Sequence, residues 1–317
     1  MNPLLSYTGR RVLVGAGLIL VVSTLVFVST QALGDPARAI LGRFATPEAL
    51  AQLRLEIGLD KPILRQYADW LGGFLQGDLG NSIASGQPVS SILGPVLMNT
   101  LALTFAALLV IIPLALVLGI WSGVRSGSKV DHVVSTASLG AIALPEFVVG
   151  TLLALLVGVK LGLVPPVSLI PPGESPLRHP DLLVLPVATL TLAGLAYLVR
   201  MVRVGVLEVM ESEYVQMARL NGVPERRVIW HHALRNALGT TVQVVAATVG
   251  WLLAGVAIVE VVFAYPGFGQ TTVQAVSQKD IPVVQAAVLF VAVVYIVINI
   301  VADLTVILLN PKLRTNA

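Results

Sequence analysis

Three acidic residues lie within long apolar stretches of this sequence, where a charge is costly. They are Glu146, Glu260 and Asp303. A charged residue at the centre of a bilayer costs about 2.5–3.5 kcal/mol on insertion scales, so each acid is expected to face protein or water. A carboxylate in such a place can bind a cation, take up a proton or tie two helices together. These three residues are therefore the candidate functional acids of the apolar part of the chain.

Glu146 is the most informative of the three. It falls near the centre of its apolar stretch and directly follows Pro145, whose ring removes a backbone hydrogen bond and frees a carbonyl group nearby. A carboxylate lining a water-filled cavity there could hold the α-ammonium group of a peptide. The alternative is a protonated Glu146 that makes a hydrogen bond between helices.

The other two acids lie nearer the ends of their stretches, where a charge costs less. Glu260 is expected to accept hydrogen bonds from the turn at 266–267. Asp303 is expected to tie spans together or to pair with Arg200 or Arg203, rather than to contact a substrate.

A second polar feature is the stretch 213–238, EYVQMARLNGVPERRVIWHHALRNAL. Only 12% of the chain is Asp, Glu, Lys or Arg, yet this stretch holds six such residues. Apolar side chains recur at helical spacing before Gly222, and Pro224 suits the first turn of a new helix. The pattern predicts a helix, a tight turn and a second helix outside the membrane. An interfacial helix in the headgroups is the alternative, but the glutamates and the glycine-proline turn favour a protein partner.

Other chemistries find little support in the sequence. The chain contains no cysteine, which excludes disulfides, thiolate ligands and a cysteine nucleophile. His231 and His232 are adjacent and lack the i, i+4 spacing of a helical metal-binding pair. In the segment GVRSGSKV at 123–130, the glycines and the lysine stand in the wrong order for a phosphate-binding loop. We therefore expect no metal, no bound cofactor and no catalytic residue in this chain.

The elements that must position these residues are membrane spans. Of the 317 residues, 56% are hydrophobic, and the apolar stretches are near the roughly 20 residues that a helix needs to cross a bilayer. The sequence predicts an all-α polytopic membrane protein with six transmembrane helices. They are expected at about 12–33, 97–121, 133–158, 182–199, 240–262 and 283–309.

The distribution of Lys and Arg predicts the orientation, because the cytoplasmic side keeps the excess of these residues. The connections on one side, the 213–238 stretch among them, hold twelve such residues, whereas the short connections on the other side hold three. Both termini and the 213–238 stretch are therefore expected in the cytoplasm. The net charge of +3 needs only this rule and no nucleic acid.

The segment 34–96, after the first span, is expected to be an external helical segment over the membrane surface. Thr46 before a proline and a glutamate marks a helix start, Gly58 a stop, and Pro62 the start of a second helix. No internal repeat is evident, so residues 1–317 are expected to form a single transmembrane domain.

The 213–238 stretch resembles the cytoplasmic "EAA" loop of ABC importer permeases in its peptide-importer form. The similarity to dipeptide/oligopeptide permeases of the B type extends over nearly the whole chain. It includes the first span with its Gly-Asp-Pro sequence and the external segment GLDKPILRQYADWLGGFLQGDLGNSI. It also includes VEVVFAYPGFGQ at 259–270 and the last span at 279–314. In the loop itself, the matching residues are Glu213, Tyr214, Ala218, Gly222, His232, Arg235, Asn236 and Ala237.

The resemblance implies the ABC type I importer permease fold and a subunit that passes di- or oligopeptides into the cytoplasm. It implies four partners: a second, homologous permease that completes a heterodimer, two ATPase subunits that bind ATP and Mg²⁺, and an extracytoplasmic substrate-binding protein. It also implies that the loop, at 204–239, couples this chain to the ATPases. The expected coupling residues are Glu213, Tyr214, Met217, Ala218, Arg219, Gly222, Val223, Pro224 and Arg226.

Two departures from the family pattern leave alternatives open. The last span ends in Asn310-Pro311-Lys312 where the family usually has Asp-Pro-Arg, and Glu146 follows a proline where the family commonly has a small or apolar residue. Related permeases differ in cargo, so nickel, glutathione or an oligosaccharide are rival substrates. A rival of another class is a proton-coupled secondary transporter that uses Glu146 and Asp303 as proton sites. It predicts proton-driven uptake by the purified chain without an ATPase.

Overall fold

The computed structural model describes residues 3–31, 37, 41–42, 45–56, 58–171, 173–229, 245, 248, 250, 252 and 255–309. The chain folds as two compact units. The first unit comprises Met1–Thr8, Asn99–Pro266 and Val297–Ala317, and the second comprises Gly9–Met98 and Gly267–Ile296. Regular structure in the described residues is helical, as predicted, apart from one isolated bridge between Asn81 and Pro88. The expectation of a single domain stays a prediction.

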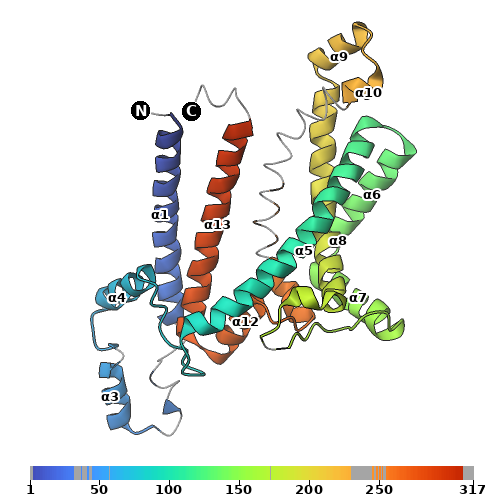
Figure 1. Ribbon diagram of the computed structural model, residues 1–317. Helices are drawn as coiled ribbons and strands as arrows, with labels where there is room; N and C mark the ends of the chain where they lie inside the picture. Colours follow the sequence, from blue (N-terminus) through green and yellow to red (C-terminus); the bar gives the residue numbers. More distant parts are fainter. Residues whose placement is uncertain are drawn as a thin grey trace. The chain divides into compact units, whose positions relative to one another are not determined.

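The second unit contains residues 9–31 of α1 (Pro3–Gln31) and residues 281–296 of α13 (Ile281–Leu309), which run side by side (Figure 1). The buried Gln285 side chain donates a hydrogen bond to the hydroxyl group of Thr30 over 2.7 Å. A Cβ added at Gly15 would lie 2.7 Å from the Ile296 side chain, so a small residue is needed where these helices meet.

The segment 34–96, which we call the external segment after its predicted position, contains α3 (Pro47–Glu56), followed by α4 (Ile63–Leu75). The Thr46 hydroxyl accepts a hydrogen bond from a backbone N–H of the first turn of α3. After α3, Gly58 adopts a φ of +71°, and its N–H and that of the next residue bond back to the last turn, which is the usual glycine-terminated helix end. The predicted start, stop and second helix after Pro62 are thus confirmed.

Aromatic side chains hold α4 against α1. The hydroxyl groups of Tyr67 and Ser23 are 2.7 Å apart, and the Tyr67 ring meets Phe27 edge-on with a centroid distance of 5.4 Å. Trp70 adds a second ring contact with Phe27 at 5.7 Å. Such contacts contribute beyond the burial of their area, so the second helix of the external segment is anchored to the first span.

The first unit is built around α5 (Val89–Val124), of which residues 99–124 belong to it, and α8 (Pro180–Met210). Gly119 and Gly123, four residues apart on α5, meet α8 so closely that an added Cβ would lie within 2.7 Å and 2.9 Å of valine side chains. Small residues at this spacing let two helix backbones approach in a membrane. The two helices therefore form the tightly packed centre of this unit.

Within the part of the chain that the structure describes, four helices are long and apolar enough to cross a membrane, namely Gly9–Gln31, Val89–Val124, Pro180–Met210 and Ile281–Val301. They match the first, second, fourth and sixth predicted spans. Of the fifth predicted span, 240–262, the structure describes residues 245, 248, 250, 252 and 255–262.

The third predicted span, 133–158, is sharply bent. Residues Lys129–Ala143 (α6) and Glu146–Lys160 meet at an angle of 98°. The second part consists of α7 (Glu146–Leu153) and a π-helical turn, η1 (Ala154–Lys160). Leu144, which precedes Pro145, is extended at φ −89° and ψ 124°, because a proline disfavours helical geometry in the residue before it. If α6 and the second part are counted as a single bent span, they form the third span.

Candidate functional site

The 213–238 stretch forms a helix–turn–helix at the end of α8, as far as it is described. It consists of α9 (Glu213–Leu220) and the short α10 (Glu225–Arg227), which stand beyond α8 in Figure 1. Val215 on α9 and Val228 after α10 are fully buried. We call the segment 213–227 the coupling loop, after the role predicted for it; residues 230–238 of the stretch lie outside the described residues.

Gly222 makes the tight turn of the coupling loop. Its φ is +76°, a region that glycine enters without steric cost. The N–H of Gly222 bonds to the carbonyl group of Arg219 over 3.0 Å, and that of Val223 bonds to Ala218 over 3.1 Å. This pair of bonds is the Schellman motif. The predicted turn is confirmed, although Pro224 caps the second helix from outside instead of standing in its first turn.

The side chains of Arg219 and Glu225 are hydrogen-bonded to each other across the turn. The guanidinium group donates two hydrogen bonds to the carboxylate, of 2.7 Å and 3.1 Å. These bonds hold the pKa of Glu225 below its usual value. Since folding lowers this pKa, the stabilisation is present above the ordinary glutamate pKa and is lost as the pH falls through the lowered value. Arg219, expected to face a partner, therefore has a partner within the chain.

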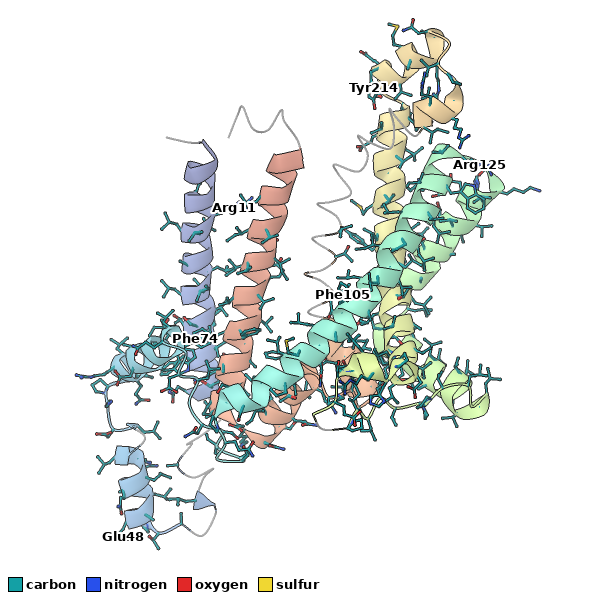
Figure 2. All side chains as sticks on the ribbon, in the orientation of Figure 1. Arg11, Glu48, Phe74, Phe105, Arg125 and Tyr214 are labelled. Carbon is teal, nitrogen blue, oxygen red and sulfur yellow. The ribbon has the colours of Figure 1, made fainter. Side chains whose placement is uncertain are left out.

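The coupling loop exposes apolar side chains that a free helix would not need. Tyr214, Met217 and Leu220 are 41%, 58% and 82% exposed, and they follow one another at intervals of three residues along α9. Figure 2 shows Tyr214 on this projecting part of the chain. Sequence reasoning missed Leu220. Of the predicted coupling residues, Ala218 and Val223 are half-buried, and Glu213, Tyr214, Met217, Arg219, Gly222, Pro224 and Arg226 are exposed.

A largely buried ion pair fixes the C-terminal half of α8 to α6. The Asp131 carboxylate accepts hydrogen bonds from two nitrogen atoms of Arg203, one of them at 2.8 Å, and from the N–H of Gly127 at 2.9 Å. Bidentate pairs of this kind are strong and directional. Arg203, one of the two arginines offered as a partner for Asp303, pairs with Asp131 in the structure. The side chain of Asp303 lies outside the described part of the chain.

Glu260 is fully buried and is bonded to α5. Its carboxylate accepts a hydrogen bond from the Thr100 hydroxyl over 2.5 Å. The neighbouring Asn99 side chain donates to the carbonyl group of Pro266 over 2.8 Å, and Asn99 also accepts from the Tyr265 hydroxyl. Asn99 thus holds the turn at Pro266, and Glu260 fastens its own helix to α5. The expected bond between Glu260 and the turn stays a prediction.

Glu146 is the first residue of α7, directly after the bend, and not the middle of a straight span. Its Oε2 atom is buried and has no hydrogen-bond partner among the described residues. The side chain lines a cavity of about 450 Å³, together with Tyr197, Gly194 and Thr248. A Cβ added at Gly255 would lie 3.0 Å and 3.1 Å from the two carboxylate oxygens. Sequence reasoning found the acid but not the glycine that leaves room for it.

In its described part, the chain is helical, with long apolar helices and a projecting helix–turn–helix at the end of α8. The family of binding-protein-dependent transport system inner membrane components matches residues 115–315, and the model for its N-terminal part matches residues 4–116. The chain belongs to this family, the permease components of ABC importers. It is accordingly a membrane protein and a transport subunit that works with ATPases and a substrate-binding protein.

The relatives differ in the cargo that their names state. A Brucella abortus (strain 2308) protein, whose name ascribes it to a peptide transport system as a permease, is 35% identical over 96% of this chain and 98% of its own length. The metal-staphylopine import permease of Staphylococcus aureus (strain NCTC 8325 / PS 47) is 34% identical over 97% of this chain and 98% of its own. The glutathione transport permease of Pectobacterium atrosepticum is 35% identical over 98% and 99%.

Proposed function

We propose that this permease passes di- and oligopeptides into the cytoplasm as one half of a heterodimer with a second, homologous permease. The peptide assignment is supported by the relatives named for peptide transport and for glutathione. The relative named for metal-staphylopine keeps a metal complex as a rival cargo.

The coupling loop is the part that an ATPase binds. The observation that carries this proposal is the exposed apolar row Tyr214, Met217 and Leu220 on a helix that projects beyond α8. Burying such a row against a partner is favourable at about 25 cal/mol per Å². The turn at Gly222 and the Arg219 pair keep the row in a fixed shape. ATP and Mg²⁺ bind to the partner ATPases, and this chain supplies no catalytic group.

The orientation follows from the basic residues. With both termini in the cytoplasm, the coupling loop, the α5–α6 turn and their arginines share the cytoplasmic side, as the excess of Lys and Arg requires. The segment 34–96 and the proline-rich connection before α8 then face outward, toward the substrate-binding protein.

The three acids take different parts in this proposal. Glu146 lines the translocation pathway, because its carboxylate reaches a cavity. Glu260 serves the pathway indirectly by fastening the end of the fifth span to Thr100. For Asp303, the pathway role stays a prediction from its position in the sixth span.

Reconstitution of the complete transporter tests the proposal. Liposomes containing this chain, the second permease and both ATPases, supplied with the binding protein, should take up di- to pentapeptides only when ATP is hydrolysed. A panel with glutathione, a nickel complex and an oligosaccharide identifies a rival cargo. Uptake by the purified chain alone, driven by a proton gradient, would instead establish the secondary transporter.

A further inference from the structure

We infer that the cavity beside Glu146 is a binding site for a primary ammonium group, so that this subunit itself selects cargo by its amine. We call it the Glu146 cavity, defined by Ala141, Ile142, Leu144, Glu146, Ala193, Gly194, Tyr197 and Thr248. The inference rests on the proposed function, since it assumes that cargo passes through this subunit.

The unpartnered carboxylate is the first observation. Oε2 of Glu146 is out of contact with solvent and accepts no hydrogen bond within the described part of the chain. Leaving a buried acceptor unpaired is costly, and such groups in native proteins call for an explanation such as a missing ligand. A donor brought by the cargo satisfies this oxygen.

The side chains that line the cavity favour the binding of a cation. Of the described residues that line it, Glu146 alone carries a charge. Tyr197, which is 48% exposed, and Thr248 add hydroxyl groups, and the remaining residues are apolar or glycine. An ammonium group offers three donors and no acceptor, and a tyrosine ring face also attracts cations. An anionic group would be repelled by Glu146 and would find no basic partner among the described lining residues.

Gly255 positions the carboxylate. A Cβ there would stand 3.0 Å and 3.1 Å from the two oxygens of Glu146, closer than an ordinary van der Waals contact, so any larger residue must push the carboxylate aside. The space of about 450 Å³ accommodates an amine and its first side chain. The cargo class is therefore compounds with a free primary amine, and peptides with a blocked amino terminus are rejected at this step.

The absence of cysteine from the chain allows a direct test of the site's charge. In the assembled transporter, Ala193→Cys places a thiol on the cavity wall with little change in volume. The thiol is treated with the cationic aminoethyl or the anionic sulfonatoethyl methanethiosulfonate, and modification of residue 193 is followed by mass spectrometry. Relative to a free thiol, we expect the cationic reagent to be favoured at least about tenfold by a carboxylate a few ångströms away.

Three further variants are made in the Ala193→Cys background. Glu146→Gln should remove the preference, Glu146→Asp should retain most of it, and Gly255→Ala should weaken it without removing a charge. Equal reagent preference in the parent and in Glu146→Gln would overturn the inference. If Glu146→Gln does not assemble, a Gly255→Ala protein with undiminished preference overturns the positioning step, and a parent without preference overturns the site.

Peptide protection separates this inference from the proposed function. Trialanine should slow the labelling of residue 193, whereas N-acetyl-trialanine at the same concentration should not. Equal protection by both peptides contradicts amine selection. A cation preference that persists without protection by either peptide leaves the cation site standing and overturns the peptide cargo.

Discussion

At position 222 the backbone conformation, and not crowding by neighbouring atoms, restricts which residue type can stand there. A Cβ added at Gly222 would have no neighbour within 4 Å, but φ is +76°. Non-glycine residues in this region cost of order 1–3 kcal/mol, most for β-branched ones, whereas asparagine tolerates it. Ala218, one turn earlier, is half-buried, and the proposed docking of an ATPase would leave little room for a larger side chain there.

We therefore expect Gly222→Val and Ala218→Glu to reduce ATPase co-purification or to uncouple ATP hydrolysis from uptake, while the spans remain inserted. Gly222→Asn is the matched control and should stay close to wild type. Arg226→Ala should be mild, because an exposed charge contributes only about 0–1 kcal/mol. Pull-down of the ATPases and substrate-stimulated hydrolysis in vesicles measure both effects. Full coupling in both small-residue variants would make the coupling loop an interfacial membrane helix.

Residues whose role depends on neighbours in the sequence could be predicted, whereas residues that pair across larger separations in the sequence were missed. The role of Gly222 could be predicted, because a helix end followed by Gly and Pro is a local signal. The pair Arg219–Glu225 spans six positions across a turn, and Asp131–Arg203 spans 72. Neither separation follows the helical i, i+4 rule, so only the folded chain brings these charges together.

At the scale of elements, Asp131 and Arg203 join α6 to the helix that carries the coupling loop. Their side chains are 6% and 24% exposed. Removing one partner leaves the other charge buried and uncompensated, which typically costs 3–5 kcal/mol.

We therefore expect Asp131→Asn to lower the free energy of unfolding of the detergent-solubilised transporter by about 3 kcal/mol. Coupled uptake should fall as well. Asp69→Asn is the control, because the Lys61–Asp69 pair is 46% and 51% exposed. Equal stability of the two variants would show that the Asp131 pair is not a structural tie.

The external segment offers a second test at this scale. In the described structure, α4 is anchored to α1 through Tyr67, whereas α3 precedes it as a separate helix. Replacing residues 45–58 by a short glycine-serine linker should therefore keep the first span and α4 in place. We expect loss of uptake that depends on the binding protein, with basal ATP hydrolysis retained. Unchanged uptake in a correctly inserted variant would exclude this part of the segment as a cover for the outer mouth or a docking site.

Spans could be located from the sequence because their apolar length is a strong signal, yet the bend in the third was missed. Pro145 carried the information, since the residue before a proline leaves the helical region. The surrounding stretch is apolar on both sides, so hydropathy alone joins the two halves. The consequence is functional, because the 98° bend places Glu146 at a helix start beside its cavity.

At the scale of the whole molecule, the proposal depends on which way the chain is threaded through the membrane. Arg125 and Lys129 flank the α5–α6 turn, whereas the connection before α8 holds Arg178 with Glu174 close by. The cytoplasmic side keeps the basic excess, so the coupling loop and the α5–α6 turn are expected there together.

Single cysteines in this cysteine-free chain test the threading. Ser126 and Ser175 are both exposed, one on each expected side. In intact cells, a membrane-impermeant sulfonated maleimide should label Ser175→Cys at once and Ser126→Cys only after the membrane is permeabilised. The reverse pattern would put the coupling loop outside the cell, where no ATPase or ATP is available. The exposed row Tyr214, Met217 and Leu220 would then need an external partner, and neither the ATPase proposal nor the inward direction of transport would stand.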